Sequence, residues 1–128
     1  MAKSDTYRTQ VGASATVQNI LANTVLERIG MWGFIMGIAR HDAGGGEIVA
    51  TVFRNSEEMV TEATMTANAQ LNPNVTDDVV FQPIPIKPTD YVRIKLRETT
   101  GAATNIRFRT EFQEAPPATV IAAAGGDR

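Results

Sequence analysis

The stretch FQPIPIKPTDYVRIKLR, residues 81–97, constrains the fold more than any other part of this chain. Three prolines in its first half lack a backbone N–H, so this half cannot be a regular central strand. An edge strand or a bend between sheets tolerates such residues, and the apolar parity changes near Pro83 as a bulge there would change it. The second half alternates apolar with charged residues, which predicts a strand with one wet face.

Further short apolar runs lie on both sides of this stretch. MWGFIMGIAR, residues 31–40, has the length of a strand buried on both faces, with its glycines at bulges or bends. HDAGGGE follows as a turn and leads into EIVATVFR, so residues 33–54 are expected to form an antiparallel hairpin. NIRFRTEFQ, residues 105–113, alternates as well, and it should lie antiparallel to the 92–97 strand or in a facing sheet.

Two segments are ambiguous. Residues 13–29 combine apolar residues at helical spacing with a short alternating run, so a helical turn leading into a strand fits both patterns. Residues 55–76 can hold a short helix, but their threonines favour strand and loop. Neither segment changes the fold class.

The chain as a whole is expected to be one all-β domain. Its 128 residues suit a single core. About seven short strands, separated by turn residues, predict an antiparallel β-sandwich. The sandwich is expected at residues 13–114, between an extended N-terminal arm at 1–12 and an extended C-terminal arm at 115–128, because neither end has a buried periodicity.

Composition narrows the classes of partner. The chain has no cysteine, which excludes disulfides and thiolate metal sites, and 12 basic against 14 acidic residues give a net charge of -2. Such a charge provides no overall field to gather nucleic acid or acidic lipid. The N-terminus lacks an apolar signal region, and residues 31–39 are too short to span a bilayer. We therefore expect synthesis in the cytoplasm and no membrane or nucleic-acid partner.

A resemblance adds to this reading. VVFQPIPIKPTDYVRIKLRETTGAATNIRFRTEFQEA, residues 79–115, resembles the last strands of jelly-roll sandwiches. Together with the glycine-linked segment 33–54, it is similar to the small jelly-roll decoration (cement) proteins of tailed bacteriophages, over about residues 20–114. The resemblance implies a structural protein of the virion, without enzymatic activity or cofactor, that is synthesised in the host cytoplasm. It would lie on the capsid surface and bind the major capsid protein of the assembled shell as a homo-oligomer.

Catalytic candidates are few. His41, the single histidine, precedes Asp42, and Ser14 or Ser56 could complete a triad. No GxSxG elbow accompanies them, so an exposed loop histidine is the better interpretation. Metal sites of jelly-roll enzymes combine several histidines with a carboxylate, and one histidine is too few.

Oxygen-bearing side chains gather in one loop and suggest calcium. Asn72, Asn74, Asp77 and Asp78 lie within a short stretch, but the DxDxDG pattern and its distal glutamate are absent. A plain turn is favoured. Likewise the glycines at 44–46 fit a turn better than a phosphate loop, because no Lys-Ser or Lys-Thr follows them.

Basic residues concentrate in the two C-terminal alternating runs. If those runs share a sheet, their outward positions form a patch that Glu98 and Glu111 relieve. Such a patch can meet an acidic capsid surface, or nucleic acid if aromatic residues are interleaved, but only Tyr91 is placed to stack. Protein contact is favoured over nucleic acid, and a solvated face is an equal alternative. The predicted partner-binding residues are Arg93, Lys95, Arg97, Arg107 and Arg109.

Two aromatic residues support an alternative function. Trp32 and Tyr91 could form a platform for sugars, as in carbohydrate-binding or receptor-binding sandwiches. The apolar neighbours of Trp32 favour packing in the core instead. The sequence therefore predicts a capsid decoration protein, with a carbohydrate-binding or receptor-binding module as the alternative.

Overall fold

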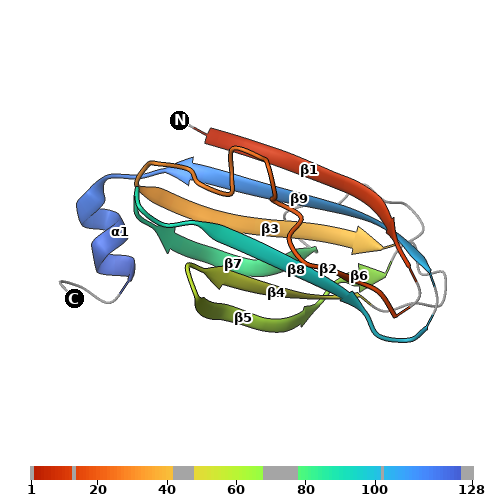
Figure 1. Ribbon diagram of the computed structural model, residues 1–128. Helices are drawn as coiled ribbons and strands as arrows, with labels where there is room; N and C mark the ends of the chain where they lie inside the picture. Colours follow the sequence, from red (N-terminus) through yellow and green to blue (C-terminus); the bar gives the residue numbers. More distant parts are fainter. Residues whose placement is uncertain (1, 13, 42–47, 68–77, 102, 125–128) are drawn as a thin grey trace.

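The computed structural model describes residues 2–12, 14–41, 48–67, 78–101 and 103–124, and it is a β-sandwich (Figure 1). The elements are β1 Ala2–Val11, β2 Thr16–Val17, β3 Gly33–His41, β4 Ile48–Arg54, β5 Glu57–Thr64, β6 Thr66–Ala67, β7 Val79–Ile86, β8 Val92–Glu98, β9 Thr104–Glu114 and α1 Pro117–Ala123. Sheet A has the order β1-β9-β3, and β3 pairs on its other side with β7 and, at its end, with β6. Sheet B has the order β2-β8-β4-β5. The prediction of an all-β antiparallel sandwich is confirmed.

Strands that are far apart in the sequence pair in a nested order. β4 pairs with β5, β3 with β7, β2 with β8 and β1 with β9, and each pair is antiparallel. The chain is therefore a long ribbon folded back on itself at the turn between β4 and β5. Successive pairs of the ribbon belong to alternate sheets, and the pairings β9–β3 and β8–β4 join them within each sheet.

The predicted hairpin over residues 33–54 is wrong. β3 lies in sheet A and β4 in sheet B, so the two strands face each other across the core and do not pair. The hairpin is one step later, where Arg54 pairs with Glu57 around Asn55, whose φ of 59° is a left-handed conformation that asparagine tolerates. Strand patterns alone do not tell a hairpin from a crossing between sheets, and the connecting residues 42–47, with their glycines, lie outside the described part.

The prolines behave as predicted. Among the described strands β7 pairs only with β3, so it is an edge of sheet A. Its register shifts between the pairs Ile35–Ile84 and Gly37–Phe81, which leaves Gln82 and Pro83 opposite a single residue of β3. This is the bulge that the change of apolar parity indicated. The open alternative for the C-terminal runs is also decided, because β8 and β9 lie in facing sheets.

The two expected arms are both corrected. Residues 2–11 form β1, which pairs with β9 over its whole length, and residues 117–123 form the helix α1, which buries Val120. β1 is held by its backbone ladder rather than by an apolar pattern, so periodicity did not reveal it. The alanines of α1 favour a helix, and Pro117 is tolerated at its first position, but one buried residue gives no amphipathic signal.

The ambiguous segments resolve in different ways. Residues 55–67 are mostly strand, as β5 and β6, while residues 68–77 lie outside the described part. Residues 18–32 are turns and bends, neither helix nor strand, although Ile20, Leu21, Leu26 and Ile29 are buried in the core. Asn19 fixes this segment to sheet B, because its Oδ1 accepts from Leu21 N at 3.0 Å and from Ile94 N at 3.2 Å.

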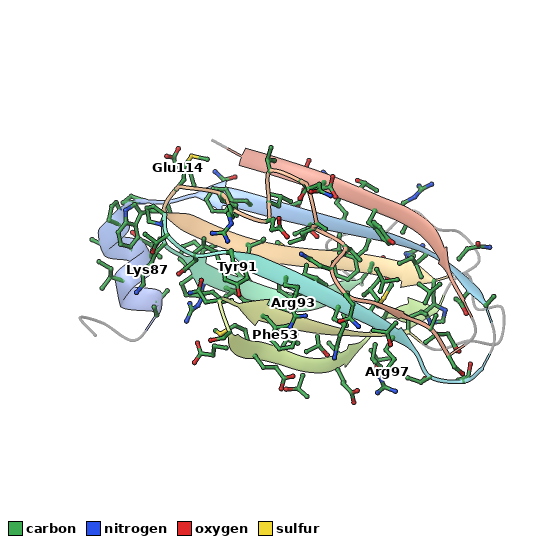
Figure 2. All side chains as sticks on the ribbon, in the orientation of Figure 1. Phe53, Lys87, Tyr91, Arg93, Arg97 and Glu114 are labelled. Atoms are coloured by element: carbon green, nitrogen blue, oxygen red, sulfur yellow. The ribbon has the colours of Figure 1, made fainter. Side chains whose placement is uncertain are left out.

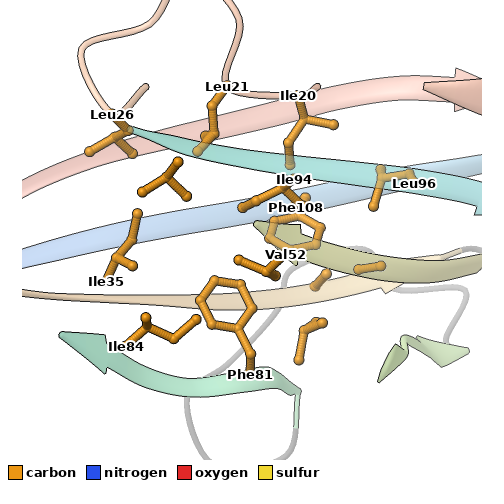
Figure 3. Packing of buried hydrophobic residues seen from close by; sticks show 14 of the residues in the cluster. Ile20, Leu21, Leu26, Ile35, Val52, Phe81, Ile84, Ile94, Leu96 and Phe108 are labelled. Carbon is orange, nitrogen blue, oxygen red and sulfur yellow. The ribbon is translucent and has the colours of Figure 1, made fainter. Parts of the chain in front are cut away.

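The core between the sheets takes its aromatic bulk from β9 and β7 (Figure 3). Gly37 of β3 leaves room for these rings: a Cβ on it would lie 2.5 Å from Phe81 Cε1 and 2.7 Å from Phe108 Cε1. Gly33 faces the ring of Phe112 in the same way. The glycines of β3 therefore serve close packing, and β3 keeps an unbroken register with β9.

Candidate docking surfaces

The five predicted cations do not form one patch. β8 and β9 belong to different sheets, and each buries its apolar parity in the core, so their outward residues lie on opposite faces of the sandwich. Arg93, Lys95 and Arg97 are on the outer face of sheet B, whereas Arg107 and Arg109 are on the outer face of sheet A. The predicted single patch is wrong, because it required the two strands to share a sheet.

The outer face of sheet B is occupied by contacts among its own side chains. The guanidinium of Arg93 lies 4.1 Å from the centroid of the Phe53 ring, and Figure 2 shows the two side chains together. Arg97 forms an ion pair with Glu62 of β5. Lys95 lies opposite Thr51 of β4. These partly exposed cations sit above a central strand whose apolar residues all point inward, which is the pattern of a solvated face.

The outer face of sheet A differs in the residues of its central strand. The outward parity of β3 carries Phe34, Met36 and Ile38, while its inward parity carries the two glycines. Ile38 is buried, but Phe34 and Met36 are only partly buried. Two large apolar side chains that are partly exposed near each other on an outer face can take part in a contact with another protein.

A depression of about 380 Å³ is hollowed into this face. Phe34, Met36 and Pro83 provide its apolar surface, and Ser4 of β1 contributes a polar one. Arg109 and Glu111 form an ion pair at 2.8 Å along the same depression. The depression combines apolar with charged side chains, on the face where sequence reasoning predicted part of a basic patch relieved by Glu111.

A buried ion pair lies next to this face. Arg40 Nε contacts Asp78 Oδ2 at 2.7 Å, and the carboxylate of Asp78 is fully buried. Arg107 is opposite Arg40 in the β9–β3 ladder. Asp78 was a candidate calcium ligand and instead pairs with Arg40, while the other three candidates, Asn72, Asn74 and Asp77, lie outside the described part.

Three of the four candidates for a catalytic triad lie in the described part of the chain. His41 is 3% exposed at the end of β3, so the expectation of an exposed loop histidine is wrong. Ser56 lies in the turn between β4 and β5, Ser14 lies before β2, and Asp42 is outside the described part. The residues that the structure describes contain no group of three or more histidines and carboxylates able to hold a metal ion. Within the same residues, no helix has the length and apolar character needed to cross a membrane.

Glu98 has a structural role that the sequence did not reveal. Glu98 is buried, and the hydrogen bonds that its carboxylate accepts include those from Thr100 Oγ1 at 2.6 Å, Ser14 N at 2.9 Å, Thr100 N at 2.8 Å and Gly101 N at 2.7 Å. The Thr100 hydroxyl first, and then the backbone donors, lower the pKa of Glu98 to about 2, although burial raises it. The carboxylate thus ties the end of β8 to the segment before β2.

The opposite end of the sandwich is tied by Asp90. Its two oxygens accept from Asn55 Nδ2 and from Lys87 N, both at 2.9 Å. Arg54 Nη1 donates to the carbonyl of Pro85 at 2.8 Å. The turn between β4 and β5 is therefore attached to the turn that follows β7. Side-chain hydrogen bonds thus connect neighbouring segments at both ends of the sandwich.

Trp32 lies at this end and is not part of the core. It is partly exposed and lines a groove of about 510 Å³ together with Met31, Pro88, Glu114 and Pro116. Tyr91 does not line this groove, and the guanidinium of Arg28 lies 5.0 Å from the centroid of its ring. The prediction that Trp32 packs in the core is wrong, and the two aromatic residues do not form a common platform.

The outward apolar face is the feature that sequence reasoning missed. The signal was present in the order G-F-I-M-G-I-A, where the small residues share one parity and the large residues mostly share the other. Comparisons with protein-family models, curated proteins and solved structures found no match to this chain.

Proposed function

We propose that this chain is a structural virion protein that binds an assembled capsid as a homo-oligomer, and that it docks through the outer face of sheet A. The observation that carries the proposal is that the outward parity of β3 brings Phe34 and Met36, both partly exposed, to the same depression. Covering such a face with another protein is favourable, because each Å² of apolar surface removed from water stabilises the complex by about 25 cal/mol.

The depression fits the anatomy of a protein interface. Interfaces combine an apolar centre with a polar border that fixes orientation. Here Met36 and Pro83 are apolar and the Arg109–Glu111 pair is charged. The matching surface on a capsid subunit is an apolar side chain that enters the depression, surrounded by polar groups that meet the ion pair.

The nested strand pairing supports the jelly-roll part of the proposal. A jelly roll arises when a long antiparallel ribbon is wound into two sheets, so that the first strand pairs with the last and the central two pair with each other. The pairs β1–β9, β2–β8, β3–β7 and β4–β5 follow this order, with β6 as an addition at the end of β3. Jelly rolls occur in viral capsid proteins and in lectins, so the fold is compatible with either of the functions considered.

Stabilisation of the shell follows from linkage. A protein that binds the assembled capsid but not its free subunits stabilises assembly by RT ln(1 + [L]/Kd), which is about 2.7 kcal/mol per site at a concentration of 100 Kd. No chemistry is required of the bound protein. Interface burial alone produces the effect.

The test is addition of the purified protein to preformed capsids that lack it. Retention of the protein on the capsids in sedimentation, together with a higher temperature of capsid disruption, supports the proposal. Capsids that bind the protein without gaining resistance contradict the stabilising role, and capsids that do not retain it contradict the proposal as a whole.

The groove at Trp32 favours one second candidate, a glycan-binding module. A partly exposed indole beside Glu114 offers an apolar surface for a sugar ring and a carboxylate near it. The chain has one tryptophan, so its emission reports on this groove alone. Saturable quenching by a glycan supports this candidate, and emission that no glycan in an array changes removes it.

A further inference from the structure

The open edges of the two sheets differ in how they are protected. A strand at a sheet edge presents unpaired N–H and C=O groups to which another strand can add, and proteins usually block such edges with prolines, bulges, charges or a covering segment. Among the described strands, sheet A ends at β1 on one side and at β7 and the two-residue β6 on the other, and sheet B ends at β5 and β2.

Two of the edges are blocked within the strand itself. β7 contains Pro83 and Pro85 and carries two shifts of register against β3. β5 also shifts register twice against β4, and Glu62 has a left-handed φ of 47°. Neither strand offers a continuous ladder to a new partner.

The third edge is covered by the chain. β2 has two residues, and beyond it the free side of β8 is met by the segment before β3. Ile20 N donates to Ile94 O at 3.0 Å, Val92 N donates to Glu27 O at 2.9 Å, and Glu98 N donates to Ala15 O at 3.0 Å. The edge of sheet B on this side is therefore already paired.

In the described part of the chain β1 has no proline, no bulge and no covering segment. It pairs with β9 through ten consecutive register pairs without a shift, and it contains no proline. Among the described residues no backbone hydrogen bond reaches its other side, and Figure 1 shows β1 at the margin of the sandwich. The sequence of this strand contains charges of both signs, at Lys3, Asp5 and Arg8.

We propose that β1 is the self-association site of this protein and that β1 of a second copy adds to it antiparallel. The two copies are then related by a twofold axis perpendicular to sheet A, which makes the contact self-complementary. This operation keeps inward parity beside inward parity, so the two sheets A join into one continuous sheet. The outer faces of the two copies then lie on the same side of the joined sheet.

The side chains select the register. Centring the axis on Asp5 places two carboxylates opposite each other, which is destabilising. Centring it on Thr6 places Asp5 opposite Tyr7 of the second copy, whose hydroxyl can donate to the carboxylate. Both residues are partly buried and have inward parity, while Thr6 is exposed on the outer side. The pairing of Thr6 with Thr6 is the register that we assign.

This contact specifies how the homo-oligomer of the proposed function forms, and it does not depend on capsid binding. The joined sheet presents two depressions on one side, so one dimer can contact two neighbouring capsid subunits, and two linked contacts bind more tightly than one. Self-association and capsid retention are measured separately. A dimer that no capsid retains overturns the proposed function alone, and a monomer that capsids retain overturns this inference alone.

The test uses cysteine variants, since the chain has no cysteine of its own. On the twofold axis two copies of residue 6 face each other with Cα atoms about 4.5 to 5.5 Å apart, within the range that a disulfide bridges. Thr6→Cys, oxidised with diamide, is expected to run as a covalent dimer without reductant. Thr64→Cys, which changes an exposed threonine on β5, is the matched control and is expected to stay monomeric on the same gel.

A second pair of variants tests the contact without oxidation. Thr6→Lys places two ammonium groups opposite each other, so it is expected to turn the dimer into a monomer by sedimentation equilibrium, while Thr64→Lys leaves the mass of the dimer unchanged. A wild-type protein that is monomeric, a Thr6→Lys variant that stays dimeric, or equal cross-linking of both cysteine variants overturns the inference.

Discussion

β3 and β8 are central strands of the two sheets, and they treat their large residues in opposite ways. β8 buries Ile94 and Leu96 and exposes cations such as Arg93, so its alternation needs nothing beyond the sandwich and water. β3 places Gly33 and Gly37 toward the core and turns Phe34 and Met36 outward.

The difference comes from what lies across the core from each strand. At positions 33 and 37 rings from β9 and β7 take the space that a side chain of β3 would fill, while Ile35 points inward and is buried in the core. On the outward side Phe34 and Met36 stay partly exposed. The outer face of sheet B has its cations in contact with Phe53 and Glu62, whereas the outer face of sheet A leaves Phe34 and Met36 partly exposed, and we therefore propose the latter as the docking face.

The largest loss of stability is expected when a side chain is added at Gly37, on the inward side of β3. Gly37→Ala puts a Cβ against the rings of Phe81 and Phe108, and overpacking of this kind lowers the free energy of unfolding by about 2 to 3 kcal/mol. Gly12→Ala is the control, since its Cβ meets Ala15 Cβ at 3.5 Å, an ordinary contact, and the change should stay within about 0.5 kcal/mol. Urea denaturation measures both, and equal stability of the two variants would show that β3 has room on its inner side.

Protonation of Glu98 in acid is expected to lower the stability of the folded protein. A carboxyl whose pKa falls from 4.5 to about 2 on folding stabilises the protein above pH 4.5, and this stabilisation is lost as the pH falls from about 4.5 to about 2. Glu98→Gln should therefore lower the melting temperature at pH 7, by less than Gly37→Ala does, and the wild type should approach the variant as the pH falls through this window. Glu57→Gln, at an exposed ion pair on β5, is the control. A gap between wild type and Glu98→Gln that is constant from pH 7 to pH 2 would contradict the prediction.

A charge placed on the outer face of sheet A tests whether this face, and not that of sheet B, binds the capsid. Met36→Lys puts an ammonium group into the apolar depression, and we expect a loss of capsid affinity of about tenfold or more, equivalent to about 1.4 kcal/mol. Lys95→Glu, on the outer face of sheet B, should leave capsid binding as it is. Binding isotherms from cosedimentation measure both variants. If Lys95→Glu is the damaging change, the docking face has been assigned to the wrong sheet.

The smallest changes in stability are expected for variants on the outer face of sheet B. Arg93→Ala removes the guanidinium from the ring of Phe53, which costs about 0.5 to 1 kcal/mol of unfolding free energy. Arg97→Ala breaks an exposed ion pair with Glu62 and should cost no more than that. Chemical denaturation measures the stability, and neither variant should weaken capsid binding. A large loss of binding in either one would show that this face also takes part in docking.

Much of the fold was accessible from local pattern. The clean alternation in residues 92–97 and 105–113 gave two strands with their buried faces, because period-2 alternation is a direct consequence of a strand with one face in the core. The prolines predicted the edge strand and its bulge, because a residue without an N–H cannot donate to a neighbouring strand whatever its tertiary surroundings.

What failed depended on partners distant in the sequence. The cations of β8 and β9 were assigned to one patch, although their strands lie in facing sheets, and β3 and β4 were expected to pair for the same reason. β1 was taken as an arm because its ladder with β9 consists of backbone bonds, which leave no trace in hydrophobic pattern.

By itself the sequence determined the β character of the chain, the inward parity of its alternating strands and the edge at the prolines, because these follow from backbone chemistry and from side chains a few residues apart. The tertiary structure alone decided which strands share a sheet, which outer face keeps its apolar residues and which edge is open. Those outcomes depend on the volume and hydrogen-bonding groups that distant segments bring to each strand, and no local pattern contains them.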